Sequence, residues 1–545
     1  MRKNGESMTY VDEMHLQRGF SIDLAYPGEA SRAPLAKALS MAESLIVVGG
    51  GSMGAGIAAV AASAGFLVTL VEPDPAVRER ARERAAGAQI VAEIPSSEAA
   101  LAIEAVPERL DVKLAVFTEM ERRLPRAVLA TNTSSLSVEE IAQSTGEPER
   151  VVGLHFFNPP EKMALVEIVR HRTASEQTIE AARAFVERIG KTGIVAADTP
   201  GFIVNRIARP FYLQALRALE AQVAQIQEMD ALARGVGFRM GPFELMDLIG
   251  LDVNLATSES IYERTGLERL APVDVQRALV AQGRLGRKSG AGFYAYDGAI
   301  PRAELRVAAH QTPNEEERVA VLGAGALAEE LSVALARHFA RVERTADEEQ
   351  IEQREEIPTV VVDAGDGASD RAGAVARLDA ALPPECTLFV DAYATDLDAC
   401  ASRARHPERI VGYGILGSFD DQAGIEIVDG AKTSDDALAL AQEMFESTGH
   451  GVVLVENVAG LFLGRVVGSI VNEAVAAVNG GVASPEDVDT AMQLGTNYPR
   501  GPIEWGREIG GARIARILRR VAEREGAAFA PERALWVLDS TDTSE

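Results

Sequence analysis

Cysteine, lysine and long apolar runs are all scarce in this sequence. Its 545 residues include only two cysteines, Cys386 and Cys400, which excludes a disulfide framework or a cysteine-rich metal cluster and indicates a reduced, cytoplasmic setting. No segment is apolar over the length of a membrane-spanning helix, and residues 1–40 lack the apolar core of a secretion signal. We therefore expect a cytoplasmic protein without a bound metal.

Positive charge is also in short supply. The formal net charge is −27, and only seven of the 54 basic residues are lysine. Such an acidic chain is not expected to bind nucleic acid or an anionic membrane. Its length predicts three or four domains, and its apolar content of 47% is sufficient for globular cores.

A glycine-rich stretch at 49–56 (GGGSMGAG) follows the apolar run 44–48 and precedes a run of small residues. The order strand, tight turn, helix is typical of a dinucleotide-binding fold, in which glycines let a pyrophosphate approach the backbone at a helix N-terminus. An isolated glycine motif is weak evidence, but here its context agrees. We predict that this loop binds the cofactor through Gly49, Gly51, Ser52, Met53 and Gly54.

The second predicted strand, at 66–71, ends immediately before Glu72. A carboxylate at this place accepts hydrogen bonds from the ribose hydroxyls and repels a 2′-phosphate, which favours NAD over NADP. The alternative is a structural turn followed by a surface glutamate.

The remaining pattern changes in character along the chain. Residues 44–197 alternate apolar runs with helical stretches, as in a doubly wound α/β domain, with further strands expected at 99–106, 127–130, 151–157 and 165–169. From residue 198 the pattern is helical, with one long helix expected at 202–225 and others at 227–237, 241–249 and 272–282. Residues 1–43 and 298–317 are polar and predict an extension and a linker.

Several segments then recur further along the chain. PERVVG at 148–153 returns as PERIVG at 407–412, GFIVNR at 201–206 as GLFLGR at 460–465, and MGPFEL at 240–245 as RGPIEW at 500–505. The spacing stays at 259 or 260 residues, which indicates an internal duplication. We predict a Rossmann domain with an all-α C-terminal domain, the pair duplicated in tandem. The expected domains are 44–197 and 198–297, then 318–456 and 457–540.

Six motifs in the first copy carry a family resemblance: TNTSSL (131–136), GLHFFNP (153–159), LVEI (165–168), DTPGFIVNR (198–206), MGPFELMD (240–247) and GRKSGAGFY (286–294). Together and in this order they closely resemble L-3-hydroxyacyl-CoA dehydrogenase. The resemblance implies NAD-dependent, reversible oxidation of (S)-3-hydroxyacyl-CoA to 3-oxoacyl-CoA. Fatty-acid β-oxidation, butyrate metabolism and a phenylacetate-type route are the pathways it suggests.

The residue types also support this chemistry independently of the family resemblance. Oxidation of a secondary alcohol needs a base for the hydroxyl proton, and histidine serves well near neutral pH. His155 ends a predicted strand, and Glu167 in the next strand is placed to orient the imidazole and stabilise its cation. The resemblance makes these two the catalytic pair. It assigns to the reacting oxygen or the substrate the residues Ser134, Asn158 and Asn205.

Each of these residues also has an ordinary interpretation. A histidine in an aromatic strand is usually packed or caps a turn, and Ser134 or Asn205 can serve as a turn or helix-start residue. Glu167 in an apolar strand is harder to explain without function, because a buried carboxylate needs a partner.

Near the nicotinamide ribose, the resemblance implies cofactor contacts from Glu108, Lys113 and Asn132. Glu108 and Lys113 lie between a predicted strand and helix, where an exposed pair at a helix start is the alternative.

Two departures from the family stand out. Between Glu72 and Glu104 the sequence is shorter by roughly one helical hairpin, the arm that touches the CoA nucleotide in the family.

The second copy lacks the third glycine of its turn, and glycines replace the site residues at Gly414, Gly417 and Gly464, so that only Glu426 matches the catalytic pair. We expect it to be an internal pseudo-subunit without catalysis, with a further homodimer also conceivable.

Two other functions remain open. One is a non-catalytic NAD-binding or structural member of the same fold, which an intact His155–Glu167 pair argues against. The other is a β-hydroxyacid dehydrogenase, but that class uses a catalytic lysine in its helical domain, and the segment 202–225 contains none.

Overall fold

The computed structural model describes residues 44–298, 304–305, 314–346, 350–351, 357–365, 370–393 and 395–539. We call residues 44–298 the first half and the later described residues the second half. The expected extension at 1–43 and most of the expected linker at 298–317 lie outside the described residues.

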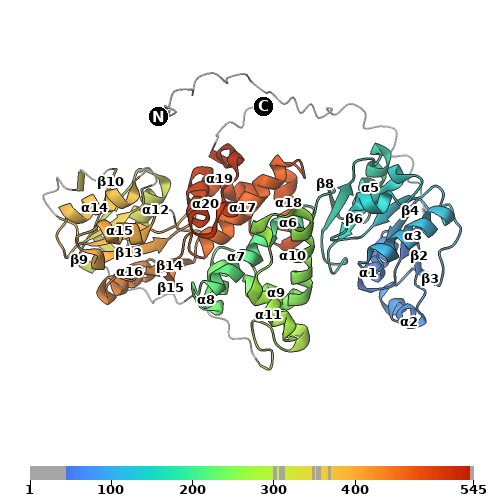
Figure 1. The fold of residues 1–545 in the computed structure, drawn as a ribbon, viewed down its shortest axis with the longest axis horizontal. Helices are drawn as coiled ribbons and strands as arrows, with labels where there is room; N and C mark the ends of the chain where they lie inside the picture. Colours follow the sequence, from blue (N-terminus) through green and yellow to red (C-terminus); the bar gives the residue numbers. More distant parts are fainter. Residues whose placement is uncertain are drawn as a thin grey trace, which may run out of the picture. The chain divides into compact units, whose positions relative to one another are not determined.

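An eight-stranded sheet forms the core of the first half, with the order β3-β2-β1-β4-β5-β6-β7-β8 (Figure 1). Neighbouring strands are parallel except β6 and β7, which pair antiparallel and place His155 opposite Glu167. The strands are β1 (Ser44–Val48), β2 (Leu67–Val71), β3 (Gln89–Val91), β4 (Leu101–Glu104), β5 (Val128–Thr131), β6 (Val151–Phe156), β7 (Leu165–Arg170) and β8 (Thr192–Ala197). The short β3 and the outer β8 are additions to the strands expected from the apolar runs.

Both faces of this sheet are buried. Leu45 and Val47 of β1 belong to one apolar cluster, whereas Ile46 and Val48 belong to another on the opposite face. This alternation within a fully apolar strand is the expected signature of a doubly wound sheet. The helices between these strands are α1 (Ser52–Ser63), α2 (Pro75–Arg84), α3 (Leu110–Arg123), α4 (Val138–Ala142) and α5 (Glu176–Arg188), with the 3₁₀ turn η2 (Pro148–Arg150).

The segment expected as one helix at 202–225 is instead two helices. Phe202 has φ of 49°, outside the helical region, so α6 (Val204–Ile207) begins only after it. Pro210 near the start of α7 (Arg209–Glu220) lacks an N–H, which ends the hydrogen-bond ladder of α6 there. Gln222 has φ of 55° and ends the second helix early. The expectation of a single long helix was therefore wrong.

The helices expected at 227–237, 241–249 and 272–282 are present, and the structure adds a separate helix, α10 (Leu251–Thr265), that the sequence pattern did not predict. The others are α8 (Ile226–Gly235), α9 (Pro242–Ile249) and α11 (Asp274–Ala281), with 3₁₀ turns η3 (Glu268–Leu270) and η4 (Arg287–Ser289). Gly250, with φ of 102°, separates α9 from α10.

The second half contains a seven-stranded sheet with the order β10-β9-β11-β12-β13-β14-β15, which matches the first sheet without a counterpart of β3. Again only one pair, β13 and β14, is antiparallel. Its strands are β9 (Asn314–Leu322), β10 (Phe339–Thr345), β11 (Val360–Asp363), β12 (Thr387–Asp391), β13 (Ile410–Gly414), β14 (Gly424–Asp429) and β15 (Gly451–Glu456). Its helices are α12 (Ala326–Leu335), α14 (Arg371–Ala381), α15 (Leu397–Arg403) and α16 (Asp435–Ser447), with η5 (Pro407–Arg409).

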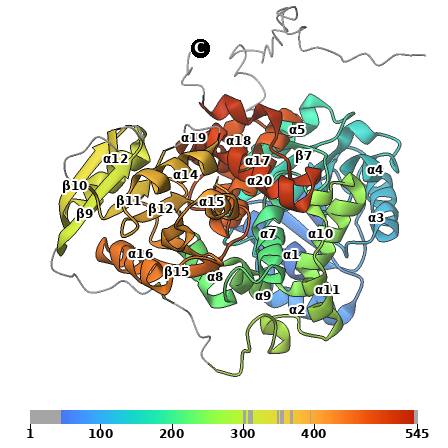
Figure 2. The same cartoon turned by 60° about the vertical axis from the view of Figure 1, so that its left-hand side comes forward.

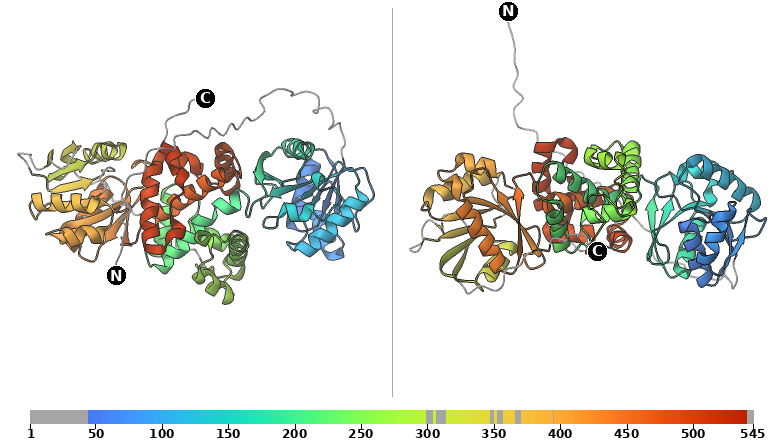
Figure 3. Two further views of the ribbon diagram at one scale, coloured as in Figure 1. Left: turned by 45° about the horizontal axis from the view of Figure 1, so that its top comes forward. Right: turned by 90° about the horizontal axis from the view of Figure 1, so that it is seen from below.

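Four helices follow this sheet and pack on the helices of the first half. They are α17 (Leu463–Asn479), α18 (Pro485–Thr496), α19 (Pro502–Ile509) and α20 (Gly511–Glu525), with η6 (Ala527–Phe529) and η7 (Arg533–Asp539). Helix α17 lies beside α7, and α18 lies beside α6 (Figure 1). Figures 2 and 3 show from other sides that these red helices lie against the green helices of the first half.

Contacts between the two halves come in pairs with exchanged roles. Arg206 Nε donates to Glu473 Oε1 at 2.7 Å, and Arg465 Nε donates to Gln214 Oε1 at 3.2 Å. Arg465 stands 259 residues after Arg206, and Glu473 stands 259 after Gln214. The two contacts are therefore reciprocal, because Arg465 takes the place of Arg206 and Gln214 takes the place of Glu473.

Backbone hydrogen bonds between the two halves show the same reciprocal pattern. The amide of Ala197 donates to the carbonyl of Val482, and the amide of Glu456, 259 residues after Ala197, donates to Val223, each at 2.9 Å. Phe238 of the first half packs against Tyr498, which stands 260 residues later, with ring centroids 5.0 Å apart.

Candidate active site

The glycine loop between β1 and α1 has the geometry that a bound pyrophosphate needs. Gly49 has φ of +112°, and a Cβ on Gly54 would lie 1.9 Å from the carbonyl oxygen of Gly49. Nothing lies within 4 Å of a Cβ placed on Gly51, so the backbone there is open to a ligand. Helix α1 starts without a side-chain cap, which leaves its first N–H groups available for phosphate oxygens. The loop therefore fits a dinucleotide.

The Glu72 side chain lies against this loop. Its Oε2 accepts the amide of Gly50 at 2.8 Å, and its Oε1 accepts the amide of Asp74 at 2.9 Å. The carboxylate is thus fixed at the end of β2, beside the glycine turn, where an adenosine ribose lies in this type of fold. Ser52 and Met53 open helix α1, and Arg84 Nη1 donates to Ser52 Oγ at 2.6 Å.

His155 and Glu167 form a buried pair. His155 Nδ1 and Glu167 Oε2 lie 2.6 Å apart, and the two side chains are 7% and 0% exposed. The antiparallel register of β6 and β7 sets them directly opposite each other. With Nδ1 donating to the carboxylate, Nε2 carries the free lone pair, which is the tautomer that a general base needs. The rings of Phe157 and Phe202 flank the imidazole at 4.6 and 5.7 Å.

Glu167 has a second role that the sequence did not predict. Its other oxygen, Oε1, accepts the amides of Ile203 and Val204, each at 3.0 Å. These are orphan donors at the start of α6, so the carboxylate also caps the first helix of the helical domain. One buried side chain therefore orients the histidine and fixes the helix that carries Asn205.

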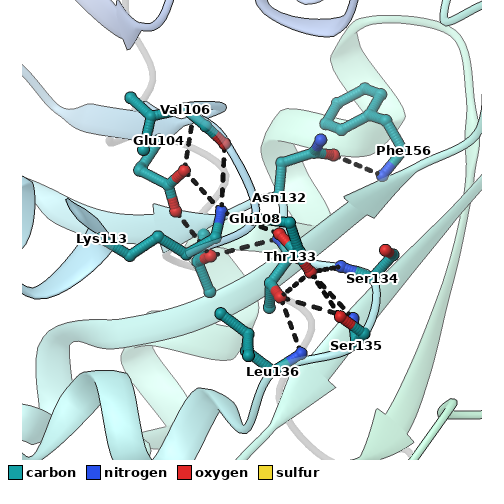
Figure 4. Close-up of polar contacts among 11 residues, drawn as sticks. Glu104, Val106, Glu108, Lys113, Asn132, Thr133, Ser134, Ser135, Leu136 and Phe156 are labelled. Atoms are coloured by element: carbon teal, nitrogen blue, oxygen red, sulfur yellow. Dashed lines mark hydrogen bonds and ion pairs between the residues drawn. The ribbon is translucent and has the colours of Figure 1, made fainter. Parts of the chain in front are cut away.

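The loop after β5 carries Ser134 and is held by Glu108 (Figure 4). Glu108 Oε1 accepts the hydroxyl of Thr133 at 2.5 Å and the amides of Ser134 and Ser135 at 2.9 and 3.0 Å. Burial alone would raise the pKa of Glu108, but Lys113 and the donors from Thr133 and Ser134 hold that pKa below its ordinary value. The structure thus gives Glu108 a positioning role for the Ser134 loop.

Lys113 is 1% exposed and lies between two carboxylates, with its Nζ 2.7 Å from Glu104 Oε1 and 3.1 Å from Glu108 Oε2. Glu104 is buried at the end of β4, where burial raises its pKa. It was not among the predicted residues, although its place at a strand end was a signal (Figure 4). The ammonium of Lys113 serves these carboxylates, and its predicted contact with the cofactor stays a prediction.

The three asparagines lie at the same edge of the sheet. Asn132 Oδ1 accepts the amide of Phe156 at 2.9 Å and so joins the ends of β5 and β6. Asn205 Nδ2 donates to the carbonyl of Ser134 at 3.4 Å, which connects α6 to the Ser134 loop. Asn158 is exposed and follows β6. The carboxyl ends of the parallel strands thus gather the candidate residues, as this fold requires.

Arg264 is a further residue that sequence reasoning missed. It lies on α10, and its Nη1 donates to the carbonyl of Ser135. It therefore makes a second connection between the helical domain and the Ser134 loop. The cue was its place near the end of an amphipathic helix, which does not reveal what the helix faces.

Comparison with known families identifies this arrangement. The NAD-binding domain profile of 3-hydroxyacyl-CoA dehydrogenase matches residues 44–95 and 87–199, and the C-terminal domain profile matches 201–296 and 460–542. This chain belongs to the 3-hydroxyacyl-CoA dehydrogenase family. Its members use NAD, and the fit of the glycine loop and Glu72 agrees with that cofactor.

Relatives of two sizes resemble this member of the family. A protein of Escherichia coli K12 named 3-hydroxyadipyl-CoA dehydrogenase is 35% identical over 512 residues, which is 89% of this chain and 94% of that protein. The crystal structure of a 3-hydroxybutyryl-CoA dehydrogenase from Escherichia coli K12 has a TM-score of 0.72 at 33% identity and covers 91% of this chain and 97% of its own. The mitochondrial hydroxyacyl-coenzyme A dehydrogenase of Sus scrofa is 36% identical over 46% of this chain and 90% of its own length.

In the second half of this dehydrogenase, a tyrosine lies where the first half has candidate site residues. Tyr393 is fully buried, and its ring lies where a Cβ on Gly414 or Gly464 would come within 2.9 or 2.7 Å of it. These glycines stand 259 residues after His155 and Asn205, and Tyr393 stands 259 after Ser134. One aromatic side chain therefore fills the space that three smaller groups share in the first half.

The phenol of Tyr393 also replaces the imidazole as a hydrogen-bond donor. It donates to Glu426 Oε2 at 2.5 Å, and Glu426 accepts the amides of Phe462 and Leu463 at 2.7 and 3.2 Å. Burial raises the pKa of Glu426 to about 7. The glutamate therefore keeps the helix-capping role of Glu167 where the histidine is lost.

Among the described residues, no helix is long and apolar enough to cross a membrane. The same described residues contain no group of three or more His, Cys, Asp or Glu side chains placed to hold a metal ion.

Proposed function

We propose that the first half oxidises (S)-3-hydroxyacyl-CoA to 3-oxoacyl-CoA with NAD, reversibly. The proposed catalytic and substrate-binding residues are His155, Glu167, Ser134, Asn158 and Asn205. The observation that carries the proposal is the buried His155–Glu167 pair, at 2.6 Å, at the sheet edge that also holds the glycine loop. A base beside a dinucleotide site is what the oxidation of a secondary alcohol requires.

In this proposal His155 Nε2 takes the proton from the C3 hydroxyl, and Glu167 stabilises the imidazolium that forms. Bound NAD supplies the acceptor for the hydride that leaves C3. Asn205 and Ser134, joined through the Ser134 carbonyl, hold the oxygen as it changes from hydroxyl to carbonyl. The products are 3-oxoacyl-CoA, NADH and a proton on His155, which passes to solvent.

We also propose that the chain is a tandem duplication with boundaries near 197, 297, 317 and 456, and that its second half is an internal pseudo-subunit. The equal strand order of the two sheets and the reciprocal contacts at Arg206 and Arg465 support this. So do relatives that pair with less than half of this chain over nearly their whole length. The Tyr393 ring in place of a base supports a second half without catalysis.

A reduced, cytoplasmic setting remains part of the proposal. Cys386 and Cys400 are buried free thiols, and burial raises the pKa of each to about 12, which keeps them protonated and unreactive.

The test is reduction of acetoacetyl-CoA by the purified chain with NADH and, in parallel, with NADPH, together with the number of NADH molecules bound per chain by calorimetry. We expect activity with NADH, at least tenfold less with NADPH because of Glu72, and one NADH per chain. Absence of activity with both cofactors contradicts the proposed reaction, and two NADH per chain contradicts the role assigned to the second half.

A further inference from the structure

Arg209 places a buried charge in the helical domain of the first half without an acidic partner. The residue is 4% exposed at the start of α7, and burial lowers the pKa of its guanidinium. Within the described part of the chain it donates to two carbonyls and one hydroxyl, and no carboxylate pairs with it. A buried charge without a counter-ion is costly, so an arginine at this position needs an explanation other than packing.

The hydrogen bonds of Arg209 join two helices. Its Nε donates to the carbonyl of Asn205 in α6 at 2.9 Å. Its Nη1 donates to the carbonyl of Asn254 at 3.3 Å and to Ser258 Oγ at 3.2 Å, both in α10. Because α6 has only four residues and ends at Ile207, few hydrogen bonds of its own fix Asn205. The guanidinium therefore fastens the short helix that carries Asn205 to α10.

Helices α6 and α10 both contact the loop that carries Ser134. Asn205 Nδ2 donates to the carbonyl of Ser134 at 3.4 Å, and Arg264 Nη1 of α10 donates to the carbonyl of Ser135. The contacts thus form a closed ring from the loop through α6, Arg209 and α10 back to the loop. Because Arg209 is the polar link between the two helices in this ring, its loss allows Asn205 to shift relative to the loop.

The second half folds the same pair of helices without this arginine. Gly468 stands 259 residues after Arg209, and Ile514 and Leu518 stand 260 residues after its two acceptors on α10. A Cβ on Gly468 would lie 3.7 Å from Leu518 Cδ2 and 3.8 Å from Ile514 Cγ2, so the space is apolar there. Helix α17 also continues without interruption through the positions of α6 and α7. The half with a glycine at the position of Asn205 therefore needs no charge to pack these helices.

We infer that Arg209 is a positioning residue for Asn205, and that it acts by fastening α6 to α10 so that the Asn205 amide keeps its place beside the Ser134 loop. This inference rests on the proposed function, in which Asn205 holds the reacting oxygen. An amide that stabilises developing charge is most effective when it is held in place before the reaction, because it then needs no reorganisation. In this role Arg209 itself touches neither the substrate nor NAD.

The experiment measures kcat and KM for acetoacetyl-CoA with NADH, thermal unfolding and NADH affinity in Arg209→Met and Arg217→Met. Methionine removes the charge and the donors, and the second half shows that this space accepts apolar groups. Arg217 is the matched control. It lies eight residues later on α7, donates to two backbone carbonyls, and stacks on Phe529 as Arg209 stacks on Tyr212.

We expect Arg209→Met to lower kcat by at least about tenfold, since removal of a fixed donor to the developing charge costs about 10²- to 10³-fold. NADH affinity should stay within threefold of the wild type, because the glycine loop is untouched. Arg217→Met should keep kcat within threefold, whatever its effect on thermal unfolding.

A double-variant cycle separates positioning from a general structural effect. If Arg209 acts through Asn205, Arg209→Met should lower kcat no further in a chain that already carries Asn205→Ala. Arg209→Lys repeats the cycle with the charge kept, and it decides the matter if Arg209→Met does not fold. One ammonium cannot replace two nitrogens that bond to different helices, so kcat should fall threefold or more, and only while Asn205 is present.

Three results would overturn the inference or the function beneath it. Losses in kcat that multiply in the double variant overturn the positioning role, because Arg209 then acts independently of Asn205. A kcat within threefold of the wild type in both Arg209 variants overturns it as well and leaves the proposed function standing. No oxidation of NADH by the wild type, with NADH bound normally, is instead the failure of the proposed function.

Discussion

Replacing Glu167 by glutamine should separate its two roles, because an amide keeps one acceptor and loses the other. Oε1 still accepts the amides of Ile203 and Val204, which now lie at 3.0 Å, so the cap on α6 survives. The NH₂ group that replaces Oε2 cannot accept the Nδ1 proton of His155. The imidazole then favours the tautomer with its proton on Nε2, which cannot act as the base.

The expected size of the effect follows from the lost contact. A hydrogen bond between charged groups contributes about 1.5–3 kcal/mol, and the imidazolium–carboxylate contact exists only once the proton has moved to His155. Its loss lowers kcat by at least about 10- to 100-fold, and the wrong tautomer lowers it further. Affinity for NADH should change less than threefold, because the glycine loop is untouched.

The second half provides the matched control. Glu426→Gln keeps the Oε1 acceptor of the Phe462 amide, and the phenol of Tyr393 can accept from the new NH₂ group as readily as it donated to the carboxylate. Only the bond from the Leu463 amide to Oε2, at 3.2 Å, is lost from the cap on α17. Steady-state oxidation of NADH with acetoacetyl-CoA, thermal unfolding and NADH titration are measured for both variants. A kcat of Glu167→Gln within threefold of the wild type would refute the orienting role. An equal loss in Glu426→Gln would refute the assignment of catalysis to the first half.

Three further results are expected. Burial raises the pKa of Glu426 from 4.5 to about 7, so the folded protein takes up a proton there as the pH falls through 7 and gains stability. Tyr393→Phe should therefore lower the free energy of unfolding little at pH 5.5 but by about 1.5–3 kcal/mol at pH 8.5, measured by denaturant unfolding. A loss that is independent of pH would contradict this. Glu473→Ala leaves Arg206 and Arg269 without their shared carboxylate and should lower the free energy of unfolding by about 3–5 kcal/mol. Gln214→Ala, at the reciprocal contact, should lower it by about 1 kcal/mol, and equal losses in the two variants would contradict the account. Gly54→Ala places a Cβ 1.9 Å from the Gly49 carbonyl and should weaken NADH binding at least tenfold by titration, whereas unchanged affinity would show that the loop does not hold the pyrophosphate.

Much of the site could be predicted because strand ends in a parallel sheet converge. His155, Asn132 and Glu72 each stand at or just beyond a predicted strand end, and the structure places all three at one edge. His155 and Glu167 meet because their two neighbouring strands, β6 and β7, run antiparallel and pair these residues directly.

Other features depend on contacts that a sequence pattern does not contain. The break between α6 and α7 arises from backbone geometry at Phe202 and Pro210 inside an otherwise continuous apolar pattern. Lys113 was expected to reach the cofactor, but whether its ammonium meets a ligand or a carboxylate depends on where Glu104 lies in space. The loss of the second histidine was evident in the sequence, whereas the filling of its space by Tyr393 was not.

The most direct test of the account is the rate of NADH oxidation with acetoacetyl-CoA by the wild type and by His155→Ala, with NADH affinity measured for both. The account predicts a rate that falls by at least 10³-fold in the variant while NADH binds with unchanged affinity, because the base is lost and the glycine loop is not touched. A variant that retains more than a tenth of the wild-type rate would contradict the assignment of His155 as the base.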